Sequence, residues 1–277
     1  MRSIRDVLSQ DGASLRTSLA LMPDEARIEV QMLLQHVLKV SRAWLLAHPE
    51  QVLDEAQAGA YAALLRRRLQ GQPIAYILGE REFFGLNFKV TPATLIPRPE
   101  TELLVELALQ RMPTRGGFRV LDLGAGSGAI ALSIAHARPE AEVVAVDASE
   151  AALQVARENT ARLGIHNASF LQSDWFSALD GQRFDLIVSN PPYVAAGDVR
   201  FEPISALASG ADGLDDIRRI VAQAGSHLES GAWLLLEHGY DQAAAVRALL
   251  QRNGFSDVFS AKDIAGIERV SCGILRD

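Results

Sequence analysis

The chain has 277 residues, 48% of them hydrophobic and 22% charged, which suits one large or two modest globular domains. A formal net charge of −7 argues against a protein that grips duplex DNA or structured RNA, because such proteins usually present a basic surface. The single cysteine, Cys272, excludes an internal disulfide and a multi-cysteine zinc site, and we expect no metal centre.

Residues 1–73 are predicted to form a small helical domain. Asp24 is a suitable cap for a helix whose apolar residues recur near helical spacing. A second pattern of this kind begins near Leu53 and ends at Gly71. The basic run 66–68 is expected on the solvated face of that helix, not as a nucleic-acid patch. Because the domain carries no catalytic pair, we expect it to dock a substrate protein; a purely structural extension is the alternative.

Residues 74–97 differ in character, because aromatic and polar residues alternate in places between Tyr76 and Val90. This pattern predicts a β-hairpin that links two domains. Residues 98–277 then alternate apolar runs that suit buried strands with segments that suit helices. The predicted strands lie near residues 118–123, 142–147, 168–172, 184–189, 231–237, 256–261 and 268–275. This order predicts an α/β domain with a mostly parallel sheet.

The first of these strands runs into a glycine-rich turn, Gly124-Ala125-Gly126-Ser127-Gly128. Glycines at these places permit a tight turn and the close approach of a ligand to backbone at a helix N-terminus. Dinucleotide-binding folds use a similar turn, but here Ile130 and Ala131 stand where a third glycine would be due. This departure disfavours a nicotinamide oxidoreductase.

The next two strands each lead to an acidic residue. Asp147, at the tip of the second strand, can accept hydrogen bonds from both hydroxyls of a ribose; a helix N-cap near Ser149 is the alternative. Asp174 follows the third strand and can accept from an adenine amine, while Trp175 or Phe176 can cover the ring. The alternative there is an ordinary polar strand end with core aromatics. Because the glycine-rich turn precedes Asp147 in the chain, the ribose role of Asp147 is favoured.

The fourth strand, 184–189, ends in Asn190-Pro191-Pro192-Tyr193. Two prolines cannot continue a strand or donate to its ladder, so a stiff loop must leave the sheet there. In open parallel sheets, ligands bind at the carboxyl ends of the strands. The loop offers a carboxamide, backbone carbonyls and a phenol ring, and these suit a planar –NH2 group. That group is either a side-chain amide or the exocyclic amine of a base.

Four strand tips in order thus offer glycines, an acid, an acid with an aromatic residue, and Asn-Pro-Pro-Tyr. This arrangement resembles the class I S-adenosylmethionine-dependent methyltransferases, which have a Rossmann-like seven-stranded sheet. The resemblance implies that S-adenosylmethionine is the cofactor. The residues that it implies for cofactor binding are Gly124, Ala125, Gly126, Ser127, Gly128, Asp147, Asp174, Trp175 and Asn190.

A longer set of segments resembles the PrmC (HemK) family of peptide chain release factor N5-glutamine methyltransferases. These segments are the helical amino-terminal region and residues 72–79, 83–85, 96–102, 190–193 and 212–214. Ala125 stands where threonine is frequent in the family, and Val194 where isoleucine is common; both departures are mild. The resemblance implies that the substrate is the glutamine of the Gly-Gly-Gln motif in class 1 release factors, whose methylation supports translation termination.

For such a transfer we expect Asn190, Pro191 and Tyr193 to be catalytic and, together with Pro192, to bind the substrate. Oδ1 of Asn190 and the carbonyl of Pro191 would accept the two N–H bonds of the substrate amide. Tyr193 would stack on the plane of that amide or wall the pocket. The acceptor loop would therefore aim the amide nitrogen at the methyl group.

Further residues are candidates outside the acceptor loop. Phe88, Arg98 and Glu100 are candidates for shaping the entrance, and the loops 202–207 and 210–214 for a wall or lid. His238 ends the fifth strand, where we expect a structural role, because transfer to an amide nitrogen needs no strong base in advance.

The main alternative is an N6-adenine or other exocyclic-amine methyltransferase acting on nucleic acid, since its acceptor loop can be identical. It would need a basic track for single-stranded or flipped substrate, which the acidic composition does not favour. A non-catalytic binding module that retains the fold is a second alternative. With no signal-peptide pattern and no run of transmembrane length, we expect a cytoplasmic monomer without membrane or direct nucleic-acid partners.

Overall fold

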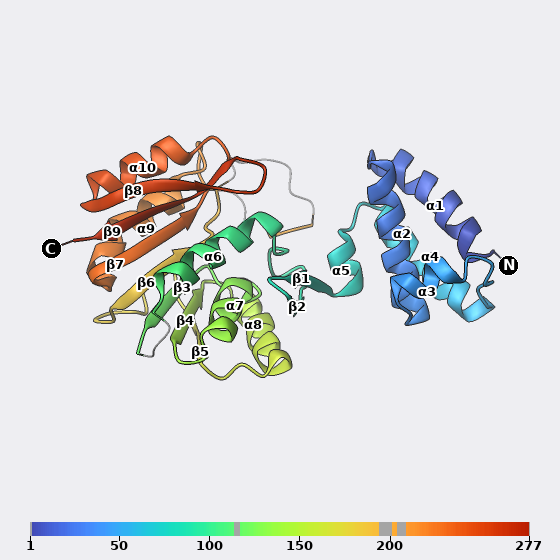
Figure 1. The fold of residues 1–277 in the computed structure, drawn as a ribbon, viewed down its shortest axis with the longest axis horizontal. Coiled ribbons are helices and arrows are strands. Elements are labelled where there is room, and N and C mark those ends of the chain that lie inside the picture. The colour runs from blue at the N-terminus through green and yellow to red at the C-terminus, as the bar shows by residue number, and fades with distance from the viewer. Residues whose placement is uncertain (1, 114–116, 194–200, 204–208, 277) are drawn as a thin grey trace. The chain divides into compact units, whose positions relative to one another are not determined.

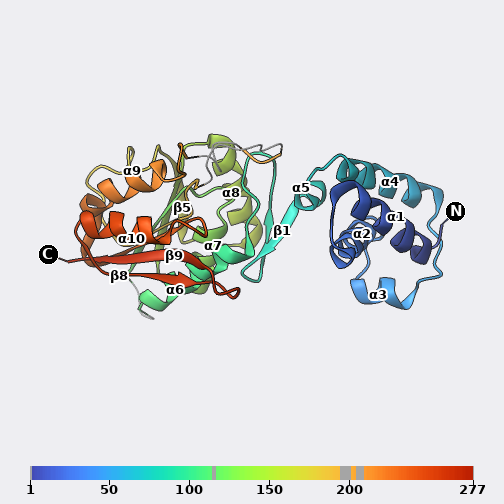
Figure 2. The same ribbon diagram turned by 90° about the horizontal axis from the view of Figure 1, so that it is seen from above.

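The computed structural model describes residues 2–113, 117–193, 201–203 and 209–276. The chain divides into two compact units, Met1–Gly79 and Glu80–Asp277 (Figures 1 and 2). The first unit has one hydrophobic core, and the second has a core on each face of its sheet. Among the described residues, no helix is both long enough and apolar enough to cross a membrane.

The first unit is helical, as predicted. Its helices are α1 (Ile4–Leu19), α2 (Pro23–Leu38), α3 (Arg42–Ala47), α4 (Glu55–Leu69) and α5 (Ile74–Leu78). Asp54 caps α4 by accepting from the backbone N–H of Gln57 at 2.8 Å. The expected cap of α2 is wrong: Met22 holds the cap position, Pro23 the first helical position, and Asp24 the first turn. Pro23 takes the first helical position because its fixed φ and missing N–H suit that position. Asp24 therefore lies within the first turn and not at the cap.

The basic run 66–68 is only partly solvated. Arg66 is exposed, but the Arg68 side chain is 11% exposed and its Nε lies 2.7 Å from a carboxylate oxygen of Glu29 on α2. Arg67 donates to the Gln72 side chain at 2.9 Å and to the Tyr76 carbonyl at 3.3 Å. Two of the three cations therefore hold the unit together instead of facing water.

The hairpin is shorter than the sequence pattern indicated. Residues 74–78 form α5 instead, because Pro73 precedes the helix and Gly79, at φ +78°, ends it. The strands are β1 (Glu80–Phe83) and β2 (Leu86–Lys89), with two residues of positive φ between them. The hairpin belongs to the second unit, where Asn159 accepts from the Lys89 N–H at 2.7 Å and donates to its carbonyl at 3.0 Å.

The second unit contains a seven-stranded sheet in the order β5-β4-β3-β6-β7-β9-β8. The strands are β3 (Arg119–Leu123), β4 (Glu142–Asp147), β5 (Ala168–Gln172), β6 (Phe184–Ser189), β7 (Leu228–Glu237), β8 (Phe255–Lys262) and β9 (Glu268–Leu275). Of the described strands in this sheet, β9 alone runs opposite to the others, and it pairs antiparallel with both β7 and β8. The predicted strands and the mostly parallel sheet are confirmed.

Helices lie on both faces of this sheet (Figure 1). They are α6 (Glu102–Arg111), α7 (Ala129–Ala137), α8 (Glu150–Leu163), α9 (Asp215–Ala224) and α10 (Ala243–Arg252), with short 3-10 turns at Pro99–Thr101 and Gly225–His227. Helices α6 and α7 pack into one core and α9 and α10 into the other. The central strands are mostly apolar on both sides because both sides are covered.

Candidate active site

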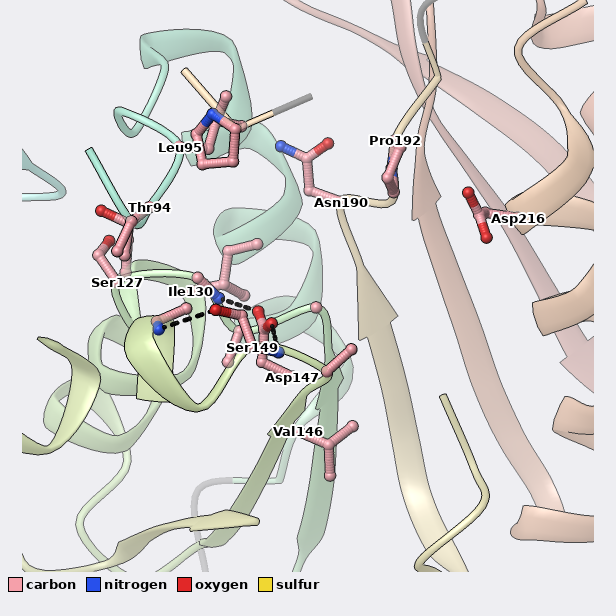
Figure 3. Close-up of a pocket in the computed structure, with 18 of the residues that line it drawn as sticks. Thr94, Leu95, Ser127, Ile130, Val146, Asp147, Ser149, Asn190, Pro192 and Asp216 are labelled. Atoms are coloured by element: carbon pink, nitrogen blue, oxygen red, sulfur yellow. Dashed lines mark hydrogen bonds between the residues drawn. The ribbon is translucent and has the colours of Figure 1, made fainter. Parts of the chain in front are cut away.

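A pocket of about 310 Å³ lies at the carboxyl ends of the parallel strands (Figure 3). Strand β3 has β4 on one side and β6 on the other, so the chain order reverses there, where open α/β sheets bind ligands. Predicted residues that line the pocket are Arg98, Gly124, Ala125, Gly126, Ser127, Asp147, Asp174, Trp175, Asn190 and Pro192. The remaining candidates Gly128, Pro191 and Tyr193 are not among its lining residues, and neither are Phe88 and Glu100.

The glycine turn after β3 forms one wall. Gly124 has a φ of +81°, and a Cβ there would stand 3.7 Å from the Trp175 ring. Gly128, also at +81°, begins α7 and packs outside the pocket, because its Cβ would meet the Ala156 Cβ at 3.2 Å. The turn thus leaves a narrow space between backbone and an aromatic ring, at a helix N-terminus.

Asp147, at the end of β4, points into this turn. Its two carboxylate oxygens accept from the backbone N–H groups of Gly126 at 2.9 Å and Ser149 at 2.8 Å. Burial raises the pKa of Asp147, and these two hydrogen bonds oppose the rise. The cap of α8 is Ser149, whose hydroxyl accepts from Ala152 N–H at 3.2 Å. Asp147 is therefore held by backbone and keeps lone pairs for a ligand.

The two aromatic residues after β5, Trp175 and Phe176, lie in different surroundings. Trp175 lines the pocket, and its Nε1 donates to Asp216 on α9 at 3.2 Å. Phe176 is 2% exposed and stacks on His227 with ring centroids 4.6 Å apart, so it belongs to the core. Asp174 forms an ion pair with Arg219 at 2.8 Å. Asp216 and Arg219 also line the pocket, although no sequence pattern singled them out.

The acceptor loop leaves β6 beside the glycine turn. Asn190 and Pro192 lie across the pocket from Asp147 and Ser149 (Figure 3). Nδ2 of Asn190 donates to the Thr101 hydroxyl at 3.3 Å, and the Tyr193 hydroxyl donates to Glu237 at 3.3 Å. Burial and the nearby Glu237 raise the pKa of Tyr193, which keeps the phenol protonated.

The loop is supported from behind by the motif Asp212-Gly213-Leu214. Gln242 donates to the carbonyls of Tyr193 at 3.0 Å and Asp212 at 3.1 Å. A Cβ at Gly213 would stand 2.2 Å from the Tyr193 carbonyl oxygen, so only glycine fits there. Of the loop expected as a wall or lid, Pro203 lines the pocket and Glu202 binds Arg98 at 2.5 Å. Residues 204–207 of that loop, and Val194, lie outside the described residues.

Among the described residues of the second unit, two carboxyls are buried that no sequence pattern singled out. Asp122 and Glu237 are 0% and 1% exposed, and burial raises the pKa of each to about 7. Asp122 accepts from the Ala131 N–H, in the first turn of α7, at 3.1 Å. The available signal was an acid inside an otherwise apolar run, since an ionisable residue is rarely buried without a partner.

His238 and Cys272 are both buried, which suits the structural role expected of His238. His238 is fully buried, with Nδ1 2.9 Å from the Gly239 carbonyl and Nε2 2.8 Å from the Ser271 hydroxyl, and burial lowers its pKa. Burial raises the pKa of Cys272 to about 12, so this thiol stays protonated.

The chemistry of the pocket fits S-adenosylmethionine. Asp147 offers carboxylate oxygens to ribose hydroxyls, and Ile130, Val146 and Trp175 supply apolar surface for a base. An added Cβ at Gly124 would narrow the space beside the Trp175 ring. These residues would hold the nucleoside part, while Asn190 lies at the acceptor side.

This fold and site define a class I S-adenosylmethionine-dependent methyltransferase. A model of the Methyltransferase small domain matches residues 100–236. The solved structure of a 16S rRNA methyltransferase of T. thermophilus, in complex with AdoMet and guanosine, matches this chain with a TM-score of 0.54 and 26% sequence identity. The match covers 71% of this chain and 50% of the T. thermophilus chain. S-adenosylmethionine is accordingly the cofactor.

Similarity to curated relatives shows the family of this chain. A model of the PrmC N-terminal domain matches residues 15–79. The release factor glutamine methyltransferase of Salmonella typhimurium is 50% identical over 257 residues, 90% of this chain and 92% of its own. That of Burkholderia pseudomallei is 52% identical over 262 residues, again 90% and 92%. The chain belongs to the release factor glutamine methyltransferase family.

Proposed function

We propose that this protein transfers a methyl group from S-adenosylmethionine to the side-chain amide nitrogen, N5, of the glutamine in the Gly-Gly-Gln motif of class 1 release factors. The observation that carries the proposal is the position of Asn190. It lies in one pocket with the glycine turn and Asp147, in a chain whose family acts on release factor glutamine.

When bound, S-adenosylmethionine supplies an electrophilic methyl group on a positively charged sulfur. Asp147 would accept from the ribose hydroxyls, and Trp175 would cover one face of the base. Asp174 keeps a carboxylate near the same slot, although Arg219 already neutralises it at 2.8 Å. The protein's remaining task is to place the acceptor nitrogen.

A carboxamide nitrogen is a poor nucleophile, because its lone pair is delocalised into the carbonyl. Oδ1 of Asn190 and the Pro191 carbonyl would accept its two N–H bonds and stabilise positive charge as it develops on the nitrogen. The prolines carry no backbone N–H that competes for these acceptors. Tyr193, anchored through its hydroxyl to Glu237, would support the loop and wall the amide.

Partner and location follow from the same proposal. The helical unit would dock the release factor, and the enzyme would act as a cytoplasmic monomer without direct contact to nucleic acid. Among the described residues, Arg98 and Arg219 line the pocket, and both are paired, Arg98 with Glu202 and Arg219 with Asp174. Their charge is therefore largely compensated, which disfavours a phosphate track into this site.

The test combines the purified protein with methyl-labelled S-adenosylmethionine and an unmodified bacterial release factor. A factor with Gln→Ala in its Gly-Gly-Gln motif is the matched control, and bacterial RNA and DNA are parallel substrates. Label on the native factor alone is the expected result. Label on nucleic acid, with none on the factor, would refute the proposal in favour of an exocyclic-amine methyltransferase.

A further inference from the structure

Trp175 holds a backbone conformation that few residues adopt. Its φ is +51°, in the left-handed region that residues with a side chain disfavour. The buried Ser173 hydroxyl donates to the Trp175 carbonyl at 2.8 Å and accepts from the Ala178 N–H at 3.1 Å. The Ser177 hydroxyl accepts from the Asp174 N–H at 3.1 Å. These bonds brace the turn, so the backbone fixes where the indole leaves the chain.

The orientation of the indole ring is set by contacts at two of its edges. Its Nε1 donates to Oδ1 of Asp216, in the first turn of α9, at 3.2 Å. Another edge faces the glycine turn, where a Cβ added at Gly124 would stand 3.7 Å from Cζ3 and 3.9 Å from Cη2. Rotation of the ring about its bond to Cβ has broad minima, so the side chain alone selects no single orientation. The bond to Asp216 does, because the indole has one N–H.

Asp216 is well placed to anchor the ring. It lines the pocket (Figure 3), its side chain is 20% exposed, and its backbone N–H donates to the Ser209 hydroxyl at 2.8 Å. Arg219 lies three positions later on the same face of α9 and donates to Oδ2 of Asp174 at 2.8 Å. Asp174 and Trp175, neighbours in the chain, are thus each held by one residue of α9. That helix packs into one core of the sheet, which makes it a firm support.

We propose that Asp216 is a positioning residue of the cofactor site, which holds the Trp175 indole in the orientation that covers the adenine of S-adenosylmethionine. The inference rests on the place proposed above for Trp175 at the base, and it adds what orients the ring there. A ring already held in its bound orientation loses little freedom when the cofactor enters, whereas a ring free to rotate loses more. Asp216 therefore raises cofactor affinity through Trp175, its carboxylate bonded to the indole and not to the cofactor.

The decisive variant is Asp216→Leu, which keeps a side chain of similar size and removes the acceptor. Asp216→Asn keeps an oxygen that accepts from the indole. Asp215→Leu is the matched control on the same turn of α9, where the carboxylate is 62% exposed and pairs with Arg218 at 2.8 Å. Calorimetry measures the Kd of S-adenosylmethionine. We expect it to rise about 10-fold in Asp216→Leu, the scale of one hydrogen bond to a charged group, and less than about 3-fold in Asp216→Asn. The control should stay near wild type.

A second measurement reads the ring without cofactor or substrate. The chain has three tryptophans, so protein labelled with 15N-tryptophan gives three indole N–H signals, and Trp175→Phe identifies that of Trp175. In Asp216→Leu this signal should move, and its hydrogen should exchange with solvent about 10-fold faster, because its acceptor is gone. Asp215→Leu should leave it in place. Trp44 and Trp233 are internal controls, because a general loss of structure would move their signals too.

A double-mutant cycle separates action through Trp175 from direct contact with the cofactor. Trp175→Phe keeps an aromatic ring and removes the N–H, so adding Asp216→Leu to it should cost no further cofactor affinity. If the two losses multiply, Asp216 acts on the cofactor directly and the inference is wrong. It is equally wrong if Asp216→Leu binds the cofactor like wild type or leaves the Trp175 signal unmoved. Because these measurements need no release factor, cofactor binding without methyl transfer to a release factor would refute the proposed function alone.

Discussion

Replacing Gly213 with alanine tests how accurately the acceptor loop must be placed. A Cβ at Gly213 would stand 2.2 Å from the carbonyl oxygen of Tyr193 and 2.7 Å from Nε2 of Gln242. Both neighbours belong to one contact, because Gln242 donates to that same carbonyl at 3.0 Å. The added methyl group therefore pushes directly on the backbone that follows Asn190-Pro191-Pro192.

The size of the effect follows from these distances. To reach ordinary van der Waals separation, the Tyr193 carbonyl must move by roughly 1 Å. A misplacement of about 1 Å near the reacting atoms costs on the order of 100-fold in rate. Alanine at the φ of +74° found at Gly213 adds a backbone cost of about 1–2 kcal/mol to stability. We thus expect a large loss of kcat together with a modest loss of stability.

Gly254→Ala is the matched control. Gly254 has a φ of +87°, but a Cβ there would meet nothing within 4 Å. It should lose similar stability and keep its turnover. The assay measures kcat on a release factor, cofactor Kd and the unfolding midpoint of both variants. Normal turnover in Gly213→Ala, or an equal loss in both, would refute the claim that this contact places the loop.

Three further outcomes are expected. Asp147→Ala should weaken cofactor binding about 10- to 100-fold by calorimetry, since bonds to a charged acceptor are lost, whereas the exposed Asp180→Ala should not. Glu29→Ala leaves Arg68, 11% exposed, without its partner and should cost about 3 kcal/mol in urea unfolding. Glu50→Ala, which breaks an ion pair 65% and 71% exposed, should cost under about 1 kcal/mol. Burial raises the folded-state pKa of Asp122 from 3.8 to about 7, so between these values the folded protein holds a proton that the unfolded chain has lost. Stability should therefore fall as pH rises from about 4 to about 7, and Asp122→Asn should remove this part of the dependence.

Each of these three expected outcomes has a result that would contradict it. Unchanged calorimetry for Asp147→Ala would remove the carboxylate from the cofactor site. Equal losses for the Glu29 and Glu50 variants would show that burial does not distinguish the two ion pairs. A stability profile that Asp122→Asn leaves unaltered would show that Asp122 ionises normally in the folded protein.

The sheet was predictable from sequence because its central strands carry apolar runs, in which Asp122 of β3 and Asp185 of β6 are the interruptions. Covered on both faces, β3, β4 and β6 need no polar alternation, and each run ends where a glycine, an acid or a proline breaks it. Residues 74–78 were harder, because five apolar and aromatic residues suit either element and only the flanking Pro73 and Gly79 favour a helix.

Local sequence could not reveal the support of the site. Asn190 is visible at the end of its strand, but Thr101 lies 89 positions away and is brought there by the turn before α6. Glu237 lies 44 positions from Tyr193. These contacts arise only when β6 and β7 pair and α6 packs beside them, so they depend on tertiary structure.

In the proposed reaction, the methyl group goes to the side-chain amide nitrogen of one glutamine. The most direct measurement is a nitrogen–proton correlation spectrum of a release factor labelled with 15N-glutamine, before and after reaction with this protein and S-adenosylmethionine. We expect the –NH2 pair of the Gly-Gly-Gln glutamine to disappear and a single N–H signal to replace it. An unchanged –NH2 pair on a factor that has nevertheless gained a methyl group would contradict the proposed reaction.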